Sequence, residues 1–393
     1  MADLNQKPLY GNAFISLLWD DAPGLRVGVK DVIDVTGTVT TAGCAVVAEE
    51  KEAATADAAC LAGVRAAGAS IVGKTNLSEL AFGATGTNAW SGTPVNPLGN
   101  SLVPGGSSSG SAVAVALGAC EVALGTDTGG SVRIPSACCG TMALKTTQGQ
   151  IPMQGVSPLA PTLDTVGPMA AKVESLALGA RLLIPSIDVT VSAETRAAVL
   201  RFSGVSAVVQ AAVEECLAQA GFTFSECSIT EVEWEAAFAA TNDILWAEAA
   251  MSNLRLRSRW RELQNGENLE LALEISKDKR RLRAARQIQR AWRSRLAKAV
   301  DLSGLIASPT IGVLPPTMDQ IRRKQVRLAR FTNPVNLAGL PAVVMPTRNV
   351  HGLPASLQLI GPASSEAVLL ASAAQIEWSC LQSGSTWTGE VPR

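Results

Sequence analysis

Histidine is almost absent from this sequence, which contains a single one, His351, among 393 residues. A serine nucleophile usually needs an imidazole to take up its proton. His351 stands in a turn bounded by glycine and proline, where we expect a surface position rather than a catalytic one. Hydrolases driven by histidine are therefore nearly excluded, and the base of any serine hydrolase must be sought among the lysines.

An excess of charge of one sign is also missing, because 33 Lys and Arg residues oppose 34 Asp and Glu residues, for a formal net charge of −1. Such a chain has no overall field that would attract nucleic acid or an anionic membrane. The N-terminus lacks the basic segment and apolar run of a signal peptide, and no apolar stretch has the length of a membrane span. We therefore expect a soluble, cytoplasmic protein with neither nucleic acid nor membrane as a partner.

The eight cysteines show no C-x-x-C pair and no spacing typical of metal ligands. A chain of this length does not need disulfide bonds to hold its core together. We expect buried free thiols, no metal site and no cofactor.

Small apolar residues, by contrast, are abundant: 47% of the chain is apolar, while aromatic residues make up only 4%. This composition is typical of α/β enzymes. Alternating apolar residues over 24–30 predict a strand that ends at Lys30. The helical spacing over 54–68 and the short run 70–73 then predict a β-α-β element.

The rest of the chain alternates between the two patterns, with a mostly helical stretch from 185 to 300. The expected helices cover 111–118, 193–218, 231–259 and 364–378, and the expected strands cover 120–124, 305–310, 342–346 and 357–361. The basic stretch 277–298 places Leu282, Ala285, Ile288, Trp292 and Leu296 near one face. This pattern favours an amphipathic helix with solvated charges over an RNA-binding helix.

One motif matches a phosphate-binding loop in letters but not in context. The sequence GASIVGKT at 68–75 fits G-x-x-x-x-G-K-[ST], yet an apolar strand lies between its glycines and no helix clearly follows. A phosphate cradle needs the strand before the first glycine and a helix N-terminus after the second. We therefore assign Lys74 a structural role.

Two glycine- and serine-rich loops carry the strongest functional signal. The first, GGSSSGS at 105–111, runs at once into an apolar helix, which a flexible linker would not do. The second, GTDTGGS at 125–131, follows a predicted strand, and its paired glycines allow backbone N–H groups to converge on one oxygen.

Together with Lys30, these loops resemble those of the amidase signature family. The resemblance extends over further blocks, at 28–31, 73–80, 92–97, 163–168, 331–341 and 352–362. It implies a single large α/β/α domain over 1–393 with a central mixed sheet flanked by helices. In this division 24–182 form the catalytic core, 185–300 a variable helical region near the substrate, and 301–393 the part that completes the sheet.

The family's catalytic triad falls by motif on Lys30, Ser107 and Ser131. The resemblance implies that Ser131 attacks the amide carbonyl, that Ser107, in a cis peptide, relays the proton, and that Lys30 is the base. Burial would keep that lysine neutral. The implied oxyanion hole consists of the backbone N–H groups of Thr128, Gly129, Gly130 and Ser131.

Other residues near the loops admit two interpretations. Arg133 could grip a substrate carboxylate, but a buried pair with an acidic residue such as Asp127 is the more frequent fate of such an arginine. Trp234, Phe238 and Trp246 could line the substrate pocket or the core, and core is commoner for aromatic residues at helical spacing.

The resemblance favours a free-standing hydrolase of a small-molecule amide, similar to indole-acetamide hydrolases, with a homodimer as a possible assembly. Two alternatives stay open: the glutaminase subunit of a glutamyl/aspartyl-tRNA amidotransferase, and a catalytically silent binding module. The chain departs from the family pattern at Ala143, Thr146 and Gln150. These departures affect the expected shape of the pocket more than the chemistry.

Overall fold

The computed structural model describes residues 10–18, 24–350 and 352–382, so His351 lies outside the described residues. Within them, one mixed sheet of 11 strands has the order β1-β3-β2-β4-β6-β5-β10-β11-β9-β7-β8. The strands are β1 (Phe14–Leu17), β2 (Arg26–Lys30), β3 (Ser70–Thr75), β4 (Val122–Asp127), β5 (Met142–Lys145), β6 (Thr165–Ala170), β7 (Arg196–Val199), β8 (Thr223–Glu226), β9 (Leu305–Pro309), β10 (Ala342–Val350) and β11 (Leu353–Ile360). The expected single domain with a mixed sheet is confirmed.

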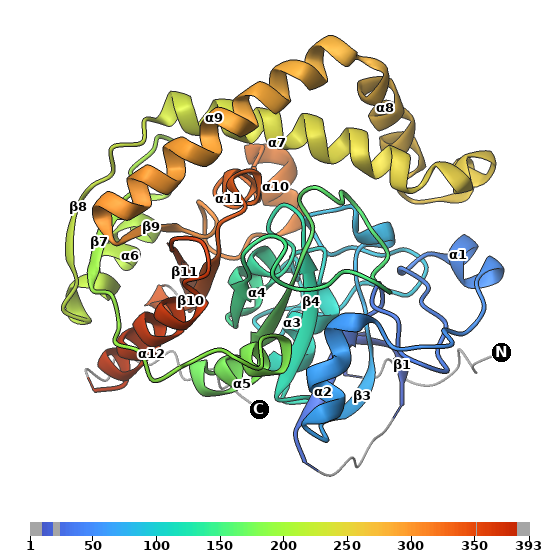
Figure 1. The fold of residues 1–393 in the computed structure, drawn as a ribbon, viewed down its shortest axis with the longest axis horizontal. Coiled ribbons are helices and arrows are strands. Elements are labelled where there is room, and N and C mark those ends of the chain that lie inside the picture. Colours follow the sequence, from blue (N-terminus) through green and yellow to red (C-terminus); the bar gives the residue numbers. More distant parts are fainter. Residues whose placement is uncertain (1–9, 19–23, 351, 383–393) are drawn as a thin grey trace.

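Helices cover both faces of the sheet (Figure 1). They are α1 (Ala45–Glu50), α2 (Ala62–Ala66), α3 (Ser109–Ala116), α4 (Arg133–Cys139), α5 (Val173–Leu183), α6 (Ala207–Gln219), α7 (Glu231–Ser252), α8 (Gly266–Lys277), α9 (Lys279–Ser303), α10 (Met318–Lys324), α11 (Asn333–Ala338) and α12 (Glu366–Gln382). Short 3₁₀ turns occupy Ala59–Leu61, Glu79–Ala81 and Leu254–Glu262. None of the described helices combines the length and the apolar composition that a membrane span requires.

The centre of the sheet is buried on both faces, and side-chain alternation divides the core into two layers. On β10, Val344 packs with the residues of α3 and α4, whereas Val343 and Met345 pack with those of α5, α6 and α12. On β5, Ala143 faces the first layer and Leu144 the second. The strands that carry the site are therefore held from both sides.

The predicted β-α-β element is present, with β2 and β3 parallel and Lys30 paired with Thr75 at their ends. The helix predicted over 54–68, however, covers only part of that range. The N–H groups of Ala54 and Ala58 bond to the carbonyls of Thr38 and Asp34, so this stretch is tied to a neighbouring loop before helical structure begins.

The stretch 185–300 is not helical throughout, which corrects the expectation from its sequence. Within the predicted helix 193–218, Arg196–Val199 forms strand β7, which pairs in parallel with β9 and β8. Pairing with these neighbours overrides the helical preference of the two alanines in this strand. The short edge strand β8 was not predicted, because most of its residues are exposed and carry no buried pattern.

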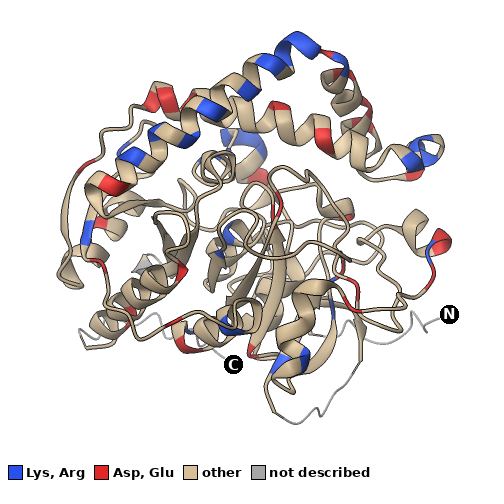
Figure 2. Cartoon of the chain, viewed as in Figure 1, with Lys and Arg blue, Asp and Glu red and all other residues tan. Residues whose placement is uncertain are grey.

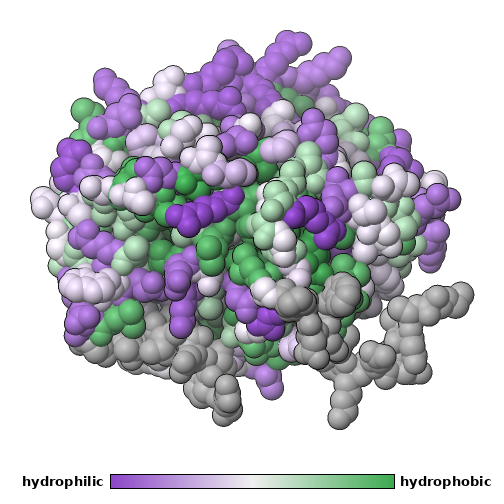
Figure 3. All heavy atoms as spheres, turned by 60° about the horizontal axis from the view of Figure 1, so that its bottom comes forward, coloured by the Kyte–Doolittle hydropathy of each residue, from purple (hydrophilic) through white to green (hydrophobic). Residues whose placement is uncertain are grey.

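The basic stretch does form a long helix, α9, whose positive side chains line the outside of the molecule (Figure 2). Ala285, Trp292 and Leu296 are buried as expected, but Ile288 is exposed and Gln289 is buried in its place. Steps of four, three and four residues lead from Ala285 through Gln289 and Trp292 to Leu296, so Ile288 lies beside this face rather than on it. Hydrophilic side chains also crowd the upper edge of the space-filling view, and apolar surface shows nearer its centre (Figure 3).

Candidate active site

Lys30 stands at the end of β2, fully buried between the two serine loops. Its Nζ donates to Ser107 Oγ at 2.8 Å and to Thr126 Oγ1 at 2.8 Å. Because β4 lies beside β2 in the sheet, Thr126 is brought within reach of this lysine. The sequence motif did not identify Thr126, although it lies inside the second loop.

Burial lowers the pKa of Lys30 from 10.5 to about 7. The negative charges of Asp127 and Asp164 act in the opposite direction but do not offset the loss of hydration. A lysine with this pKa is about half neutral at pH 7 and can accept a proton from a hydroxyl group at physiological pH.

Ser107 is held by the loop that precedes α3. The peptide bond between Gly106 and Ser107 is cis, as the family resemblance implies, and the Ser107 carbonyl accepts from Ser78 N at 3.0 Å. Any side chain at Gly106 would meet the Gly83 carbonyl oxygen at 2.5 Å. The glycine before Ser107 is therefore required by close backbone packing.

Ser131 lies between β4 and α4 and reaches into a cavity. A backbone hydrogen bond of 3.0 Å from Ser108 N to the Ser131 carbonyl joins the two serine loops directly. Gly130 adopts a φ of 124°, and a Cβ there would lie 2.6 Å from the Cβ of Thr332. Both the conformation and the space therefore demand glycine next to Ser131.

The four residues predicted for the oxyanion hole lie together in the loop after β4, but one of their donors is already used. Gly130 N donates to Asp127 Oδ1 at 2.8 Å, which removes it from the predicted set. Among the described residues, the N–H groups of Gly129 and Ser131 have no acceptor in the chain. Three of the four predicted donors, including that of Thr128, therefore remain for a substrate oxygen.

Arg133 is not available to a substrate, because it forms the buried pair that the sequence favoured. Its Nη2 lies 2.9 Å from Asp127 Oδ1, and neither side chain is exposed. Arg133 also donates to Gln358 Oε1 at 2.8 Å and to Asn336 Oδ1. Burial alone would raise the pKa of Asp127, but the Arg133 guanidinium outweighs it and holds this pKa well below its usual range.

Asp164 is a second buried carboxylate near the nucleophile loop. It accepts from Thr128 Oγ1 at 2.6 Å and from the backbone N–H groups of Leu159 and Ala160. Burial raises its pKa despite these bonds. Asp164 lies in one of the blocks that resemble the family, but its contact with Thr128 could not be inferred from the sequence.

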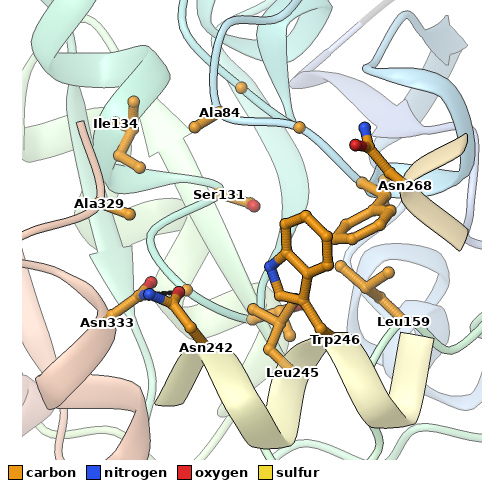
Figure 4. Close-up of a pocket in the computed structure, with 16 residues that line it drawn as sticks. Ala84, Ser131, Ile134, Leu159, Asn242, Leu245, Trp246, Asn268, Ala329 and Asn333 are labelled. Carbon is orange, nitrogen blue, oxygen red and sulfur yellow. Dashed lines mark hydrogen bonds between the residues drawn. The ribbon is translucent and has the colours of Figure 1, made fainter. Parts of the chain in front are cut away.

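The cavity beside Ser131 has a volume of about 260 Å³. Its apolar wall comes from Phe82, Ile134, Leu159, Leu245 and Trp246, and its polar side chains besides Thr128 and Ser131 are Asn242, Asn268 and Asn333 (Figure 4). Asn333 Nδ2 donates to Asn242 Oδ1 at 2.8 Å. No described residue that lines this cavity is an acid, a lysine, an arginine or a histidine.

The three aromatic residues singled out from the sequence have different positions. Trp234 is fully buried in the core, as the commoner outcome predicts. Phe238 is half-buried beneath the guanidinium of Arg327. Trp246 instead lines the cavity, together with Asn242 and Leu245 from the same helix, α7.

Lys74, the lysine of the apparent phosphate-binding motif, is fully buried at the end of β3. Its Nζ lies 3.0 Å from Asp31 Oδ1 and donates to Thr40 Oγ1 at 3.0 Å. The motif's second glycine, Gly73, lies within the strand itself. No helix N-terminus follows it in the described structure, so the structural role assigned to Lys74 agrees with its surroundings.

This fold and site define a serine-dependent amide hydrolase, and comparison with known proteins agrees. The model of the Amidase family matches residues 22–370. The chain therefore belongs to the amidase family and is an enzyme that hydrolyses carbon–nitrogen bonds of amides. The resemblance inferred from the sequence is confirmed.

Relatives and solved structures cover most of this chain. The A subunit of the glutamyl-tRNA(Gln) amidotransferase from Symbiobacterium thermophilum is 34% identical, over 91% of this chain and 82% of that protein. Its namesake from Natronomonas pharaonis is 33% identical, over 89% and 95%. A crystal structure of an amidase superposes with a TM-score of 0.81 at 28% identity, over 90% and 84%, and that of the namesake from Thermotoga maritima with 0.78 at 26%, over 94% and 87%.

Proposed function

We propose that this amidase hydrolyses a small, uncharged carboxamide through an acyl-enzyme on Ser131, with Ser107 as proton relay and Lys30 as base. The observation that carries the proposal is the 2.8 Å hydrogen bond between Lys30 Nζ and Ser107 Oγ at a lysine whose pKa is about 7. A lysine in this state can serve the role that histidine fills in other serine hydrolases.

In the first half-reaction, Ser131 Oγ bonds to the amide carbon while its proton passes to Ser107, whose own proton passes to neutral Lys30. The oxyanion is stabilised by free backbone N–H groups, including those of Gly129 and Ser131. The carbon–nitrogen bond then breaks as the proton returns along the same path to the departing amine or ammonia. Water attacks the ester in the second half-reaction and releases the acid.

The lining of the cavity supports an uncharged acyl group. An ion bound in a half-buried apolar site needs a counter-charge or several hydrogen bonds to replace its hydration. The described lining offers aromatic and aliphatic side chains with three asparagines and no ionisable group. Asn242, Leu245, Trp246 and Asn268 come from the stretch 185–300, in keeping with the expected role of that stretch near the substrate.

A second candidate is the glutaminase subunit of a tRNA-dependent amidotransferase, the enzyme named in the relatives at 34% and 33% identity. That function would require the site to accept the α-ammonium and α-carboxylate groups of glutamine and the chain to work with partner subunits. The uncharged lining of the cavity favours the first candidate over this one.

The experiment is a measurement of ammonia release by the purified chain from arylacetic, aryl and short aliphatic carboxamides and from glutamine. Ser131→Ala serves as the inactive variant. Ser136→Ala is the matched control, because it removes a buried hydroxyl that has no partner among the described residues. Turnover of uncharged amides that is lost only in Ser131→Ala supports the proposal, whereas turnover of glutamine alone would establish the second candidate.

A further inference from the structure

The indole N–H of Trp246 is the unusual feature of the cavity. Three other tryptophans, all buried, donate this group to backbone carbonyl oxygens: Trp234 to Arg330 at 2.8 Å, Trp260 to Asn253 at 3.2 Å and Trp292 to Pro334 at 2.8 Å. In the described part of the chain, Trp246 Nε1 has no such acceptor. A tryptophan in an enclosed site usually satisfies this donor, so its partner is expected from outside the chain.

The direction of this donor is fixed by packing. The ring of Trp246 meets that of Phe82 edge to face, with centroids 5.2 Å apart and an interplanar angle of 77°. Figure 4 shows the indole extending into the cavity near Ser131, with its nitrogen-bearing edge toward the side that holds Asn242 and Asn333. A donor held in place before binding loses little conformational entropy when an acceptor arrives.

The surroundings of the donor restrict which acceptor can satisfy it. Leu159, Leu245 and Phe82 supply apolar surface, and Asn242 and Asn333 are hydrogen-bonded to each other. A carboxylate in this position would find no cation among the described lining residues. The fitting partner is therefore a neutral oxygen or nitrogen acceptor on a flat, largely apolar group.

We propose that Trp246 is a specificity residue whose Nε1–H donates to a neutral acceptor on the acyl group of the substrate. The favoured substrate class is then an uncharged carboxamide in which an aromatic ring, packed against Phe82 and Trp246, carries a ring nitrogen or an ether or carbonyl oxygen. This inference rests on the proposed function, because it assumes that the acyl group occupies the cavity beside Ser131.

The test compares kcat/KM for phenylacetamide with kcat/KM for the three pyridylacetamides at a mildly alkaline pH, where the pyridine ring is neutral. Trp246→Phe keeps an aromatic ring against Phe82 but removes the donor. The matched control, Trp234→Phe, removes an indole N–H that is bonded to Arg330 in the core and lies outside the cavity. Thermal unfolding of each variant confirms that it is folded.

We expect Trp246→Phe to lower the preference for the best pyridyl amide over phenylacetamide by about five- to tenfold, the value of one neutral hydrogen bond. Trp234→Phe should lower thermal stability and leave the preference unchanged. An equal preference in the wild type and Trp246→Phe, with both amides hydrolysed, would overturn this inference alone. No turnover of any of the four amides would overturn the proposed function and this inference with it.

Discussion

Replacing Lys30 with methionine should change the pH dependence of stability in a way that reports the charge of this lysine. Its pKa falls from 10.5 in the unfolded chain to about 7 in the folded one. Between these values the unfolded chain binds a proton that the folded chain does not, so wild-type stability rises with pH. Between about pH 7 and about pH 9 this amounts to about 2 kcal/mol, at 1.36 kcal/mol for each pKa unit.

Lys30→Met has no such group, so the wild type should gain about 2 kcal/mol of unfolding free energy relative to the variant over this interval. The hydrogen bonds lost at Ser107 and Thr126 change the offset between the two proteins but not this slope. The assay is urea unfolding of both proteins at several pH values. Lys145→Met is the control: Lys145 is also buried with a pKa of about 7, so its variant should show the same slope while keeping its activity. A difference between Lys30→Met and the wild type that stays constant with pH would refute the neutral-lysine mechanism.

Three further predictions concern the same site. The kcat/KM for a neutral amide should rise through about pH 7 and level off above it, because the base must be unprotonated; a profile that falls with pH over this range would assign Lys30 another role. Gly130→Ala should lower kcat by at least about tenfold, because a Cβ there would meet Thr332, whereas Gly118→Ala, at a positive φ with open space, should affect only stability; equal activity losses would show that the crowding is unimportant. Arg133→Met should cost about 3 to 5 kcal/mol of unfolding free energy, because it leaves Asp127 charged and buried; chemical denaturation measures this, and a loss below about 1 kcal/mol would contradict the buried-pair assignment.

The parts of the site that could be predicted from the sequence are those that short motifs encode. Lys30 ends an alternating strand, and Ser107 and Ser131 stand in glycine loops whose tight packing admits no larger residue. The pairing of Arg133 with Asp127 could also be anticipated, since few other environments suit a buried arginine so close to an aspartate.

The remaining features depend on contacts between distant segments. Trp246 and Asn242 reach the cavity only because α7 packs over the catalytic core, and helical spacing alone does not separate them from Trp234 in the core. The use of the Gly130 N–H by Asp127 is likewise a contact between side chain and backbone that no motif specifies. Strand β7 shows the same limit at the level of the fold, because its pairing with β9 decides a conformation that its alanines do not.

The most direct test of the proposed mechanism is to find where an acyl group is held on the enzyme. The chain is mixed with an activated ester of a neutral arylacetic acid, quenched in acid during turnover, and digested for peptide mass mapping, with Lys30→Met and Ser131→Ala treated alike. The mechanism predicts one acyl group on Ser131, formed slowly in Lys30→Met and absent in Ser131→Ala. An acyl group on Ser107, or turnover by Ser131→Ala at the wild-type rate, would contradict it.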